Sequence, residues 1–295
     1  MLAYTPTPIQ EIHDPILGKA GLRLLIKRED LNHPVVSGNK WWKLKYNLEE
    51  AKNQKKKTVL TFGGAYSNHI FSTAAAANEL GVNSIGIIRG EETLPLNHTL
   101  SFARSKGMQL HYVSREQYRK KNDPEFIQKL HDQFGDFYLI PEGGTNELAI
   151  KGCEEFAKTL GDDFDYLCCS VGTGGTLAGI INGLSSSKNV LGFSSLKGGD
   201  FLHADVAQWL TPDQHHDWRV ITDYHFGGYG KTTPALEEFK NYFEQKNNIP
   251  LDPVYTVKMM AGVFDLVQKE FFKPGSTFLA IHSGGLQGIC YPNKS

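Results

Sequence analysis

The residues Ser37-Gly38-Asn39-Lys40 run directly into Trp41-Trp42-Lys43-Leu44, and this segment is the most informative part of the chain. From Trp41 onward, apolar residues recur every three or four positions, which predicts an amphipathic helix. Lys40 would lie at its first turn, where free backbone N–H groups and the helix dipole disfavour a second positive charge. A partly buried lysine there would have a lowered pKa, and a neutral amine can attack a carbonyl carbon. The segment therefore predicts a Schiff-base lysine, and an ordinary exposed lysine is the simpler alternative.

The composition is that of a globular protein of one large or two modest domains. The 295 residues are 40% hydrophobic and 21% charged, with a net charge of -1. This charge gives no reason to expect a nucleic acid or an anionic membrane as a partner, and no apolar run is long enough to span a bilayer. The N-terminal stretch does not resemble a signal peptide. We therefore expect a cytoplasmic protein.

Cysteine and histidine spacing argues against a metal centre. The four cysteines contain no CxxC pair, so we expect reduced and mostly buried thiols: Cys153, Cys168, Cys169 and Cys290. The cluster Gln214-His215-His216 has no third ligand at a useful interval, which predicts surface histidines rather than a metal site.

Short β-type runs alternate with helical patterns along the chain, which predicts a doubly wound α/β protein with parallel sheets. The predicted strands are 22–27, 58–62, 83–89, 109–113, 137–140, 166–170, 190–193 and 278–282. The predicted helices are 70–80, 97–105, 146–160, 176–184 and 259–271. The segment 198–217 shows little periodicity and is left unassigned.

The loop Gly172-Thr173-Gly174-Gly175-Thr176 joins a predicted strand to a predicted helix. Small residues let backbone N–H groups approach an anion, the helix adds its positive end, and the threonine hydroxyls add donors. The loop lacks the Gly-Lys-Ser/Thr of a Walker A motif and the third glycine of a dinucleotide fingerprint. Phosphate is therefore the predicted occupant, with a purely structural strand–helix joint as the alternative.

Two further loops follow predicted strands. In Gly63-Gly64-Ala65-Tyr66-Ser67-Asn68-His69, the polar residues are either simple helix caps or the grip for a substrate carboxylate. The turn His282-Ser283-Gly284-Gly285 follows the last predicted strand. A pre-helical lysine, a phosphate-type loop and a separate anion-binding helix start together describe a site for pyridoxal phosphate.

In this order the motifs resemble those of 1-aminocyclopropane-1-carboxylate (ACC) deaminases and D-cysteine desulfhydrases. The motifs are Lys27-Arg28-Glu29-Asp30, SGNKxxKL, GGxxSNH, VGTGGTLAG, GGYG, LDPVYTxKxM and HSGG. The resemblance covers nearly the whole chain and implies pyridoxal-phosphate fold type II, with two three-layer αβα domains and mostly parallel sheets. It implies a large domain of residues 1–45 plus 161–295, a small domain of residues 46–160, and a homodimer.

The resemblance also implies roles for individual residues. Lys40 would bind the coenzyme as an imine, and Asn68 would contact its ring hydroxyl. The loop 172–176 would hold the phosphate, while Ser67 and His69 would join Asn68 at the substrate. Tyr229 and Tyr255 match the two tyrosines that flank the substrate in this family. Core packing or a loop anchor is the alternative role for both tyrosines.

Thr256 and Ser283 help to choose between the two activities. Deaminases carry a glutamate in place of Thr256, which pairs with the pyridine nitrogen and strengthens the ring as an electron sink. Deaminases also have leucine in place of Ser283 and tend to have glutamine in place of His69. The resemblance therefore favours β-elimination on D-cysteine, giving pyruvate, sulfide and ammonia, over deamination of ACC to 2-oxobutyrate.

Two other classes of protein are considered. A nicotinamide-dependent oxidoreductase needs an acidic residue about twenty positions after the glycine loop, and the tract 185–193 has none. A catalytically silent binding protein would lose the lysine or the serine, and this chain has both Lys40 and Ser67. The predicted class is therefore a pyridoxal-phosphate enzyme.

Overall fold

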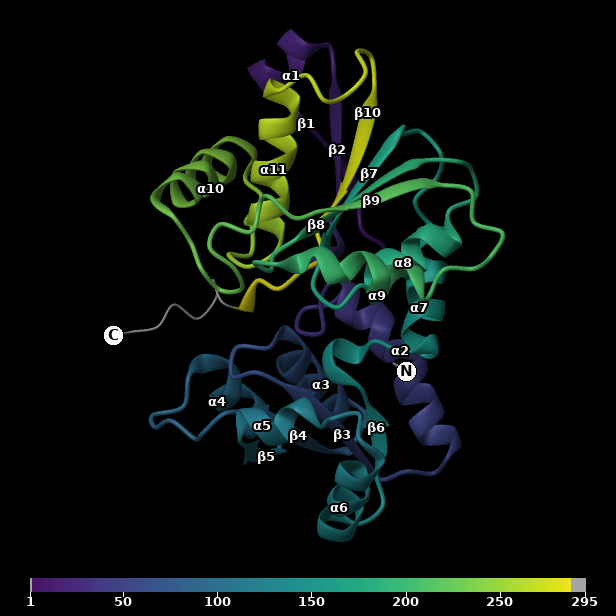
Figure 1. Ribbon diagram of the computed structural model, residues 1–295, viewed down its shortest axis with the longest axis vertical. Coiled ribbons are helices and arrows are strands. Elements are labelled where there is room, and N and C mark those ends of the chain that lie inside the picture. The colour runs from purple at the N-terminus through teal and green to yellow at the C-terminus, as the bar shows by residue number, and fades with distance from the viewer. Residues whose placement is uncertain (1, 288–295) are drawn as a thin grey trace.

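The computed structural model describes residues 2–287, which form two α/β domains, each built on one sheet (Figure 1). The larger domain contains a 6-stranded sheet in the order β1-β2-β10-β7-β8-β9, and the smaller one a 4-stranded sheet in the order β5-β4-β3-β6. Only the edge strand β1 is antiparallel to its neighbour. The predicted α/β class with mostly parallel sheets is confirmed.

The larger sheet is covered by helices on both faces. Its strands are β1 (Ile9–Ile12), β2 (Arg23–Lys27), β7 (Tyr166–Val171), β8 (Asn189–Ser194), β9 (Asp217–Ile221) and β10 (Thr277–Ile281). One face packs against α1 (Pro15–Ala20), α10 (Pro234–Asn247) and α11 (Thr256–Gln268). The other packs against α2 (Asn39–Asn53), α7 (Glu147–Ala157), α8 (Gly175–Gly183) and α9 (Leu202–Ala207). Three short 3-10 turns also occur, namely η1 (Glu29–Leu31), η2 (Glu142–Gly144) and η3 (Gly199–Phe201).

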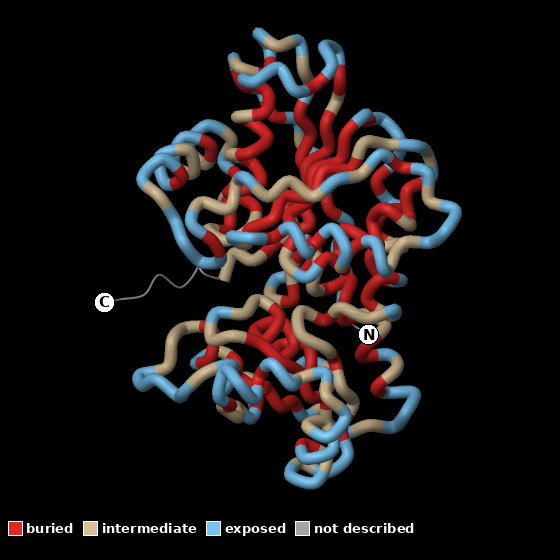
Figure 2. The backbone as a smooth tube through the Cα atoms, in the orientation of Figure 1, coloured by how far each residue is buried: buried red, intermediate tan, exposed pale blue. Residues whose placement is uncertain are grey.

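The smaller sheet has the same three-layer construction. Its strands are β3 (Thr58–Gly63), β4 (Asn83–Arg89), β5 (Met108–Val113) and β6 (Tyr138–Ile140). Its helices are α3 (Asn68–Glu79) and α4 (His98–Ser105) on one face, and α5 (Arg115–Arg119) and α6 (Pro124–Phe134) on the other. Figure 2 shows that the buried backbone follows the strands of both sheets, as parallel sheets covered on both faces require.

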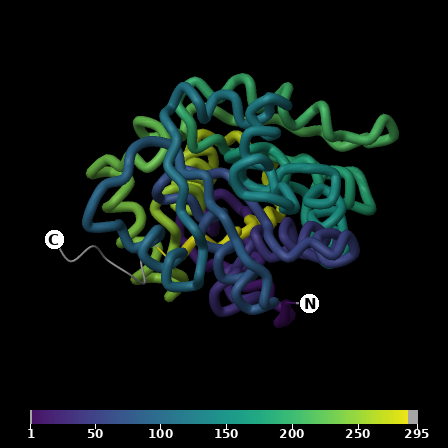
Figure 3. Tube along the Cα trace, turned by 90° about the horizontal axis from the view of Figure 1, so that it is seen from below, coloured from purple at the N-terminus to yellow at the C-terminus, as the bar shows by residue number. Residues whose placement is uncertain are grey.

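The loops at the carboxyl ends of both sheets meet. Gly143, after β6, lies against Thr173, after β7: a Cβ atom on the glycine would stand 2.9 Å from the threonine hydroxyl. Asn68, after β3, lies in the same way against Gly285, after β10. We call the region formed by the loops after β3, β6, β7 and β10 the domain junction; Figure 3, viewed from below, shows the segments of the smaller domain lying across those of the larger one.

All eight predicted strands are present, as are the helix predicted from Trp41 and the five other predicted helices, with ends shifted by a few residues. The sequence analysis missed the strands β1 and β9 and the helices α1, α5, α6 and α10. The unassigned segment 198–217 contains η3 and α9. The predicted domain boundaries stay a prediction. Helix α7, which they assign to the smaller domain, packs against α8 under the larger sheet.

The cysteine prediction is confirmed for the thiols that the structure describes, since Cys153, Cys168 and Cys169 are free and buried; Cys290 lies outside the described residues. The prediction of two surface histidines is wrong for His216. This ring is buried, and its Nδ1 accepts a hydrogen bond from the N–H of Lys188 at 3.2 Å. Within residues 2–287 no three metal-ligating side chains converge, and no helix is long and apolar enough to cross a membrane.

Candidate active site

Lys40 lies in the first turn of α2, where the sequence places it, and burial lowers its pKa to about 8. Nearby Cys153, Cys169 and Asp252 oppose this shift without cancelling it. The sequence predicts two causes of a lowered pKa, the start of the helix and burial. Burial, which removes the amine from water, is confirmed as the main cause. An amine with this pKa is neutral in a useful fraction of molecules near neutral pH, as a nucleophile requires.

Gly38 brings the start of α2 against the turn after β10. It adopts φ +70° and ψ -144°, and a Cβ atom there would stand 1.8 Å from the carbonyl oxygen of Ser283. The same carbonyl accepts the N–H of Asn39 at 3.2 Å. Only glycine fits both the conformation and the contact. Two motifs that are more than two hundred positions apart in sequence are thus fixed together beside Lys40.

The glycine loop 172–176 lies between β7 and the start of α8, as predicted, with Gly174 at φ +77°. A Cβ atom on Gly175 would stand 2.8 Å from Thr145, and one on Gly172 would stand 3.1 Å from the ring of Tyr255. Thr176 accepts a hydrogen bond from the side chain of Asn39 at 2.9 Å. The backbone of the loop is therefore tightly enclosed, next to the residue that precedes Lys40.

Lys43 is a candidate site residue that the sequence analysis did not single out. Its side chain is 1% exposed, and its Nζ donates to Thr145 Oγ1 at 2.8 Å and to Thr173 Oγ1 at 3.5 Å. Burial, followed by repulsion from Lys40, lowers its pKa to about 7. Since positions 40 and 43 share one face of a helix, the spacing could have pointed to this residue. Lysine and threonine donors around a glycine loop form a suitable donor set for a phosphate group.

Ser67 is the N-cap of α3, with its Oγ accepting the N–H of Ile70 at 3.3 Å. The simple capping interpretation of the second loop is therefore correct for this residue, whose hydroxyl proton remains available to a ligand. Asn68 begins the helix, and its side-chain oxygen accepts a hydrogen bond from Gln287. The start of α3 thus faces the loop after β10 and lies within the domain junction.

His69 is buried and has a defined tautomer. Its Nε2 is 2.8 Å from Thr61 Oγ1, and the hydroxyl of Thr61 donates its own proton to the carbonyl oxygen of Ile140. The imidazole must therefore carry its proton on Nε2, which leaves Nδ1 as an acceptor without a partner in the described structure. Burial, followed by Lys40 and Lys43, holds the pKa of His69 well below its usual value, so the ring is neutral.

Tyr229 and Tyr255 lie side by side, with ring centroids 6.0 Å apart in an edge-to-face arrangement. Burial raises the pKa of both phenols, and for Tyr255 the neighbouring Tyr229 adds to the rise. Lys258, which is buried, donates to the carbonyl oxygens of His225 at 2.8 Å and Gly228 at 2.7 Å. This lysine holds the backbone of the turn that carries Tyr229, a role that its sequence position did not reveal.

Thr256 forms a closed pair with Asp252 at the start of α11. One carboxylate oxygen accepts the N–H groups of Val254 at 2.9 Å and Tyr255 at 2.8 Å. The other accepts both the N–H, at 2.7 Å, and the hydroxyl proton of Thr256. Because its proton is committed to the carboxylate, the Thr256 oxygen can only accept a hydrogen bond from a ligand.

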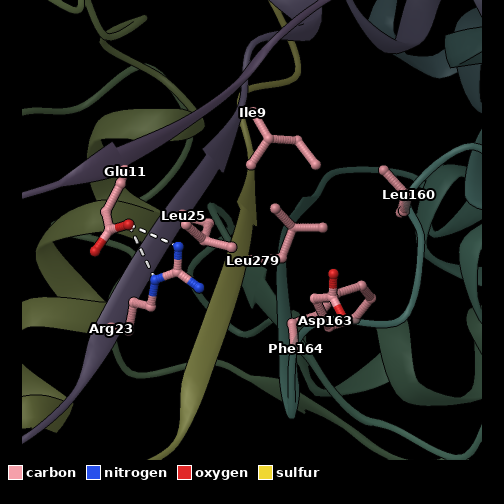
Figure 4. A pocket seen from close by; sticks show the side chains of 8 residues that line it. All are labelled: Ile9, Glu11, Arg23, Leu25, Leu160, Asp163, Phe164 and Leu279. Carbon is pink, nitrogen blue, oxygen red and sulfur yellow. Dashed lines mark hydrogen bonds and ion pairs between the residues drawn. The ribbon is translucent and has the colours of Figure 1, made fainter.

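A separate hollow of about 300 Å³ lies on the outer side of the larger sheet (Figure 4). Ile9, Leu25 and Leu279 line it, and the cation at its side, Arg23, already pairs with Glu11 at 2.7 Å. Its other charged lining residue is Asp163. None of the predicted site residues lines this hollow, and we propose the domain junction as the place of the chemistry.

Comparison with known proteins gives a consistent result. A family model described as pyridoxal-phosphate dependent enzyme matches residues 1–284. The bifunctional D-cysteine desulfhydrase/1-aminocyclopropane-1-carboxylate deaminase of Arabidopsis thaliana, a mitochondrial protein, is 33% identical over 98% of this chain and 78% of its own length. A putative 1-aminocyclopropane-1-carboxylate deaminase of Thermotoga maritima is 31% identical over 98% of this chain and 96% of its own length. The D-cysteine desulfhydrase of Klebsiella pneumoniae strain 342 is 27% identical, with 98% and 94% covered.

Solved structures agree with the sequence relatives. The crystal structure of an ACC deaminase homologue superimposes with a TM-score of 0.82 at 29% identity, covering 100% of this chain and 94% of that one. An O-acetylserine dependent cystathionine beta-synthase from Helicobacter pylori reaches a TM-score of 0.69 at 16% identity, over 99% and 96% of the two chains. At that identity the likeness concerns the fold alone.

Proposed function

The chain belongs to the family of pyridoxal-phosphate-dependent enzymes, and we propose that it catalyses β-elimination on a small D-amino acid, with D-cysteine giving pyruvate, sulfide and ammonia. The observation that carries this proposal is the half-buried amine of Lys40, with a pKa of about 8, at a junction lined by the glycine loop and two tyrosines. The relatives include proteins named for either activity, so the choice of D-cysteine rests on Thr256 and Ser283.

The residues at the junction fit pyridoxal 5′-phosphate. The enclosed backbone of the loop 172–176, the buried ammonium of Lys43 and the hydroxyls of Thr145 and Thr173 form a donor set for its phosphate. Lys43 has no carboxylate partner in the described structure, so an anion there would relieve the cost of its burial. When bound, the coenzyme supplies an aldehyde for the Lys40 amine and a ring that delocalises the electron pair left on Cα.

Each predicted site residue then has a physical task. Lys40 would hold the coenzyme through its amine, and the same amine, when free and neutral, would take the proton from Cα of the substrate. The free N–H groups at the start of α3, with Ser67 and Asn68, bind the α-carboxylate. His69, neutral and with Nδ1 unprotonated, accepts a hydrogen bond from the substrate.

The two tyrosines act on the leaving group. Because burial raises the pKa of Tyr255 well above its usual value, its hydroxyl stays protonated and can donate to the departing sulfur. Tyr229, on the turn held by Lys258, borders the same space. Ser283 fixes the start of α2 through its backbone carbonyl, and its hydroxyl is proposed to face the coenzyme ring.

A second candidate, deamination of ACC to 2-oxobutyrate, is favoured by one specific observation. The hydroxyl of Thr256 donates a hydrogen bond to Asp252, so its oxygen acts as an acceptor backed by a carboxylate. Such a pair can hold a protonated pyridine nitrogen in part as a glutamate would. Threonine and glutamate at this position therefore differ less in their ability to hold a protonated pyridine nitrogen than the sequence suggests.

Parallel assays on the purified protein test the proposal. Sulfide and pyruvate are measured from D-cysteine and L-cysteine, and 2-oxobutyrate is measured from ACC, with Lys40→Ala as the inactive control. Release of sulfide from D-cysteine, well above any release of 2-oxobutyrate from ACC, is the expected result. Activity on ACC alone would contradict β-elimination on D-cysteine and support deamination of ACC.

We also propose that the protein is a cytoplasmic homodimer. The near-neutral net charge and the family resemblance support this proposal, and light scattering after size-exclusion chromatography measures the assembly. A monomeric mass at micromolar concentration would contradict it.

A further inference from the structure

The carboxyl edge of the smaller sheet carries a cation next to the candidate substrate loop. Arg89 is the last residue of β4, and the parallel register pairs Ile88 with Gly63, so that Arg89 adjoins Gly64. The Arg89 Nη2 atom lies 3.5 Å from where a Cβ atom on Gly64 would stand. The guanidinium therefore lies over the backbone of the loop that leads to Ser67.

The neighbours of Arg89 orient it without neutralising it. Its Cζ atom lies 5.5 Å from the ring centroid of buried Tyr118, whose hydroxyl donates to Glu142 at 2.7 Å. Glu142 in turn pairs with Lys121 at 3.3 Å. Among the described residues, Glu142 is the carboxylate bound to this cluster, and its ion-pair partner is Lys121 rather than Arg89. Within residues 2–287, the side chain of Arg89, an exposed residue, has no carboxylate at ion-pair distance and no hydrogen-bond partner.

Arg89 also interacts with a tyrosine of the larger domain. Burial raises the pKa of Tyr229, and Arg89 opposes that rise, so the two side chains interact electrostatically although they belong to different domains. Tyr229 packs against Tyr255, which contacts the glycine loop. A substrate held between Ser67 and these tyrosines would therefore have the guanidinium near its side chain.

We propose that Arg89 is a specificity-determining residue that binds a negatively charged group on the β-carbon of the substrate. The α-carboxylate already has the start of α3, so the five donors of this arginine serve a second anion. The inference rests on the proposed β-elimination and refines its substrate class. The class comprises amino acids whose β-substituent is anionic, such as a sulfate or phosphate ester or the ionised thiol of cysteine.

D-Serine O-sulfate and β-chloro-D-alanine provide a matched test, because both have good leaving groups and only the sulfate ester has a charged side chain. In each, the Cα proton goes to Lys40, the electron pair of that bond forms the Cα–Cβ double bond, and sulfate or chloride departs with the electron pair of its bond to Cβ. One water then converts the released 2-aminoacrylate to pyruvate and ammonium. Pyruvate therefore reports both reactions.

Arg89→Met should lower kcat/KM for D-serine O-sulfate by about tenfold to a hundredfold, as expected for a lost hydrogen-bonded ion pair, and leave β-chloro-D-alanine within about twofold. Arg89→Lys should restore part of the loss. Arg219→Met, at an exposed arginine on β9 that pairs with Asp217, is the control and should change neither rate. Equal losses on both substrates, or no loss on either, would overturn the assignment.

A binding measurement separates this inference from the proposed function. D-Cysteate and D-alanine differ in the same charge, and their binding is followed by the absorbance of the bound coenzyme before any sulfite leaves D-cysteate. Arg89→Met should weaken the binding of D-cysteate by the same factor and leave the binding of D-alanine unchanged. If the wild type eliminates neither substrate, the proposed function fails, while unchanged D-cysteate binding in Arg89→Met would reject the role of the arginine by itself.

Discussion

The hydroxyl of Thr256 donates its proton to the carboxylate of Asp252, four residues earlier in the turn that opens α11. Both side chains are buried, and Asp252 also lies close enough to Lys40 to oppose the lowering of its pKa. The carboxylate and the threonine thus form one hydrogen-bonded unit, which we propose to lie at the pyridine nitrogen of the coenzyme. Thr256 alone would be a weak partner for the pyridine nitrogen, but the carboxylate of Asp252 places a negative charge directly behind its hydroxyl.

Asp252→Asn should disturb this pair, because an amide has one acceptor oxygen where the carboxylate has two. At least one donor among Thr256 and the N–H groups of Val254 and Tyr255 would then lose its partner. We expect unfolding free energy to fall by about 1–3 kcal/mol and turnover to fall by about tenfold or more. Thermal unfolding and steady-state assays measure the two effects. Thr256→Ser, which keeps the hydroxyl, is the control, and wild-type turnover in Asp252→Asn would disprove the coupling.

The buried ammonium of Lys43 should make the coenzyme-free protein more stable as the pH rises. Its folded pKa of about 7 lies below the ordinary value of 10.5, so between these values the unfolded chain binds more protons than the folded one. Unfolding free energy should therefore increase above pH 7, with a contribution of up to about 1.4 kcal/mol per pH unit. Denaturant titrations of wild type and Lys43→Met between pH 6.5 and 8.5 measure the difference. Parallel pH curves for the two proteins would contradict this prediction.

Gly38→Ala and Gly198→Ala are compared because both glycines have φ +70°, although ψ is -144° at Gly38 and 37° at Gly198, so that only Gly38 has a conformation restricted to glycine. Nothing lies within 4 Å of a Cβ atom on Gly198, whereas one on Gly38 would overlap the carbonyl oxygen of Ser283. Gly198→Ala should cost about 1 kcal/mol and keep the coenzyme. Gly38→Ala should separate the start of α2 from the turn after β10 and abolish coenzyme absorbance. Equal behaviour of the two variants would argue against a required contact at Gly38.

Lys258→Met should release the turn that carries Tyr229 by leaving the carbonyl groups of His225 and Gly228 without their donor. We expect KM for the amino acid to rise by about tenfold, with a smaller change in coenzyme affinity, because the phosphate loop is untouched. Lys269→Met is the matched control, because this exposed lysine directly follows α11 and pairs with Asp265. A larger change in coenzyme affinity than in KM would assign Lys258 to the coenzyme rather than to the turn.

Much of the fold could be predicted because buried parallel strands leave continuous apolar runs, as in β3, β7 and β8. The edge strands β1 and β9 carry exposed charges and lack that pattern, so they were missed. Residues that mark a motif, such as Lys40, could be identified from local spacing. Lys43 and Lys258 could not, because a lysine reads as a surface residue until the packing around it is known.

The Thr256–Asp252 pair shows a second limit of sequence reasoning. Both residue types were visible, but whether the Thr256 hydroxyl donates to the Asp252 carboxylate depends on the geometry of a single turn. The same applies to His69, whose tautomer follows from the hydrogen bond that Thr61 makes to Ile140. Donor and acceptor roles of this kind are assigned by neighbours distant in sequence, and they determine the chemistry of the site.

Borohydride reduction of the coenzyme-loaded protein, followed by peptide mass spectrometry, tests whether Lys40 carries the coenzyme. We expect the absorbance near the visible edge to disappear and one peptide, containing Lys40, to gain the mass of the reduced coenzyme, while Lys40→Ala gains none. A label on Lys43 or another lysine, or an unlabelled protein that still eliminates sulfide from D-cysteine, would contradict the assignment of Lys40.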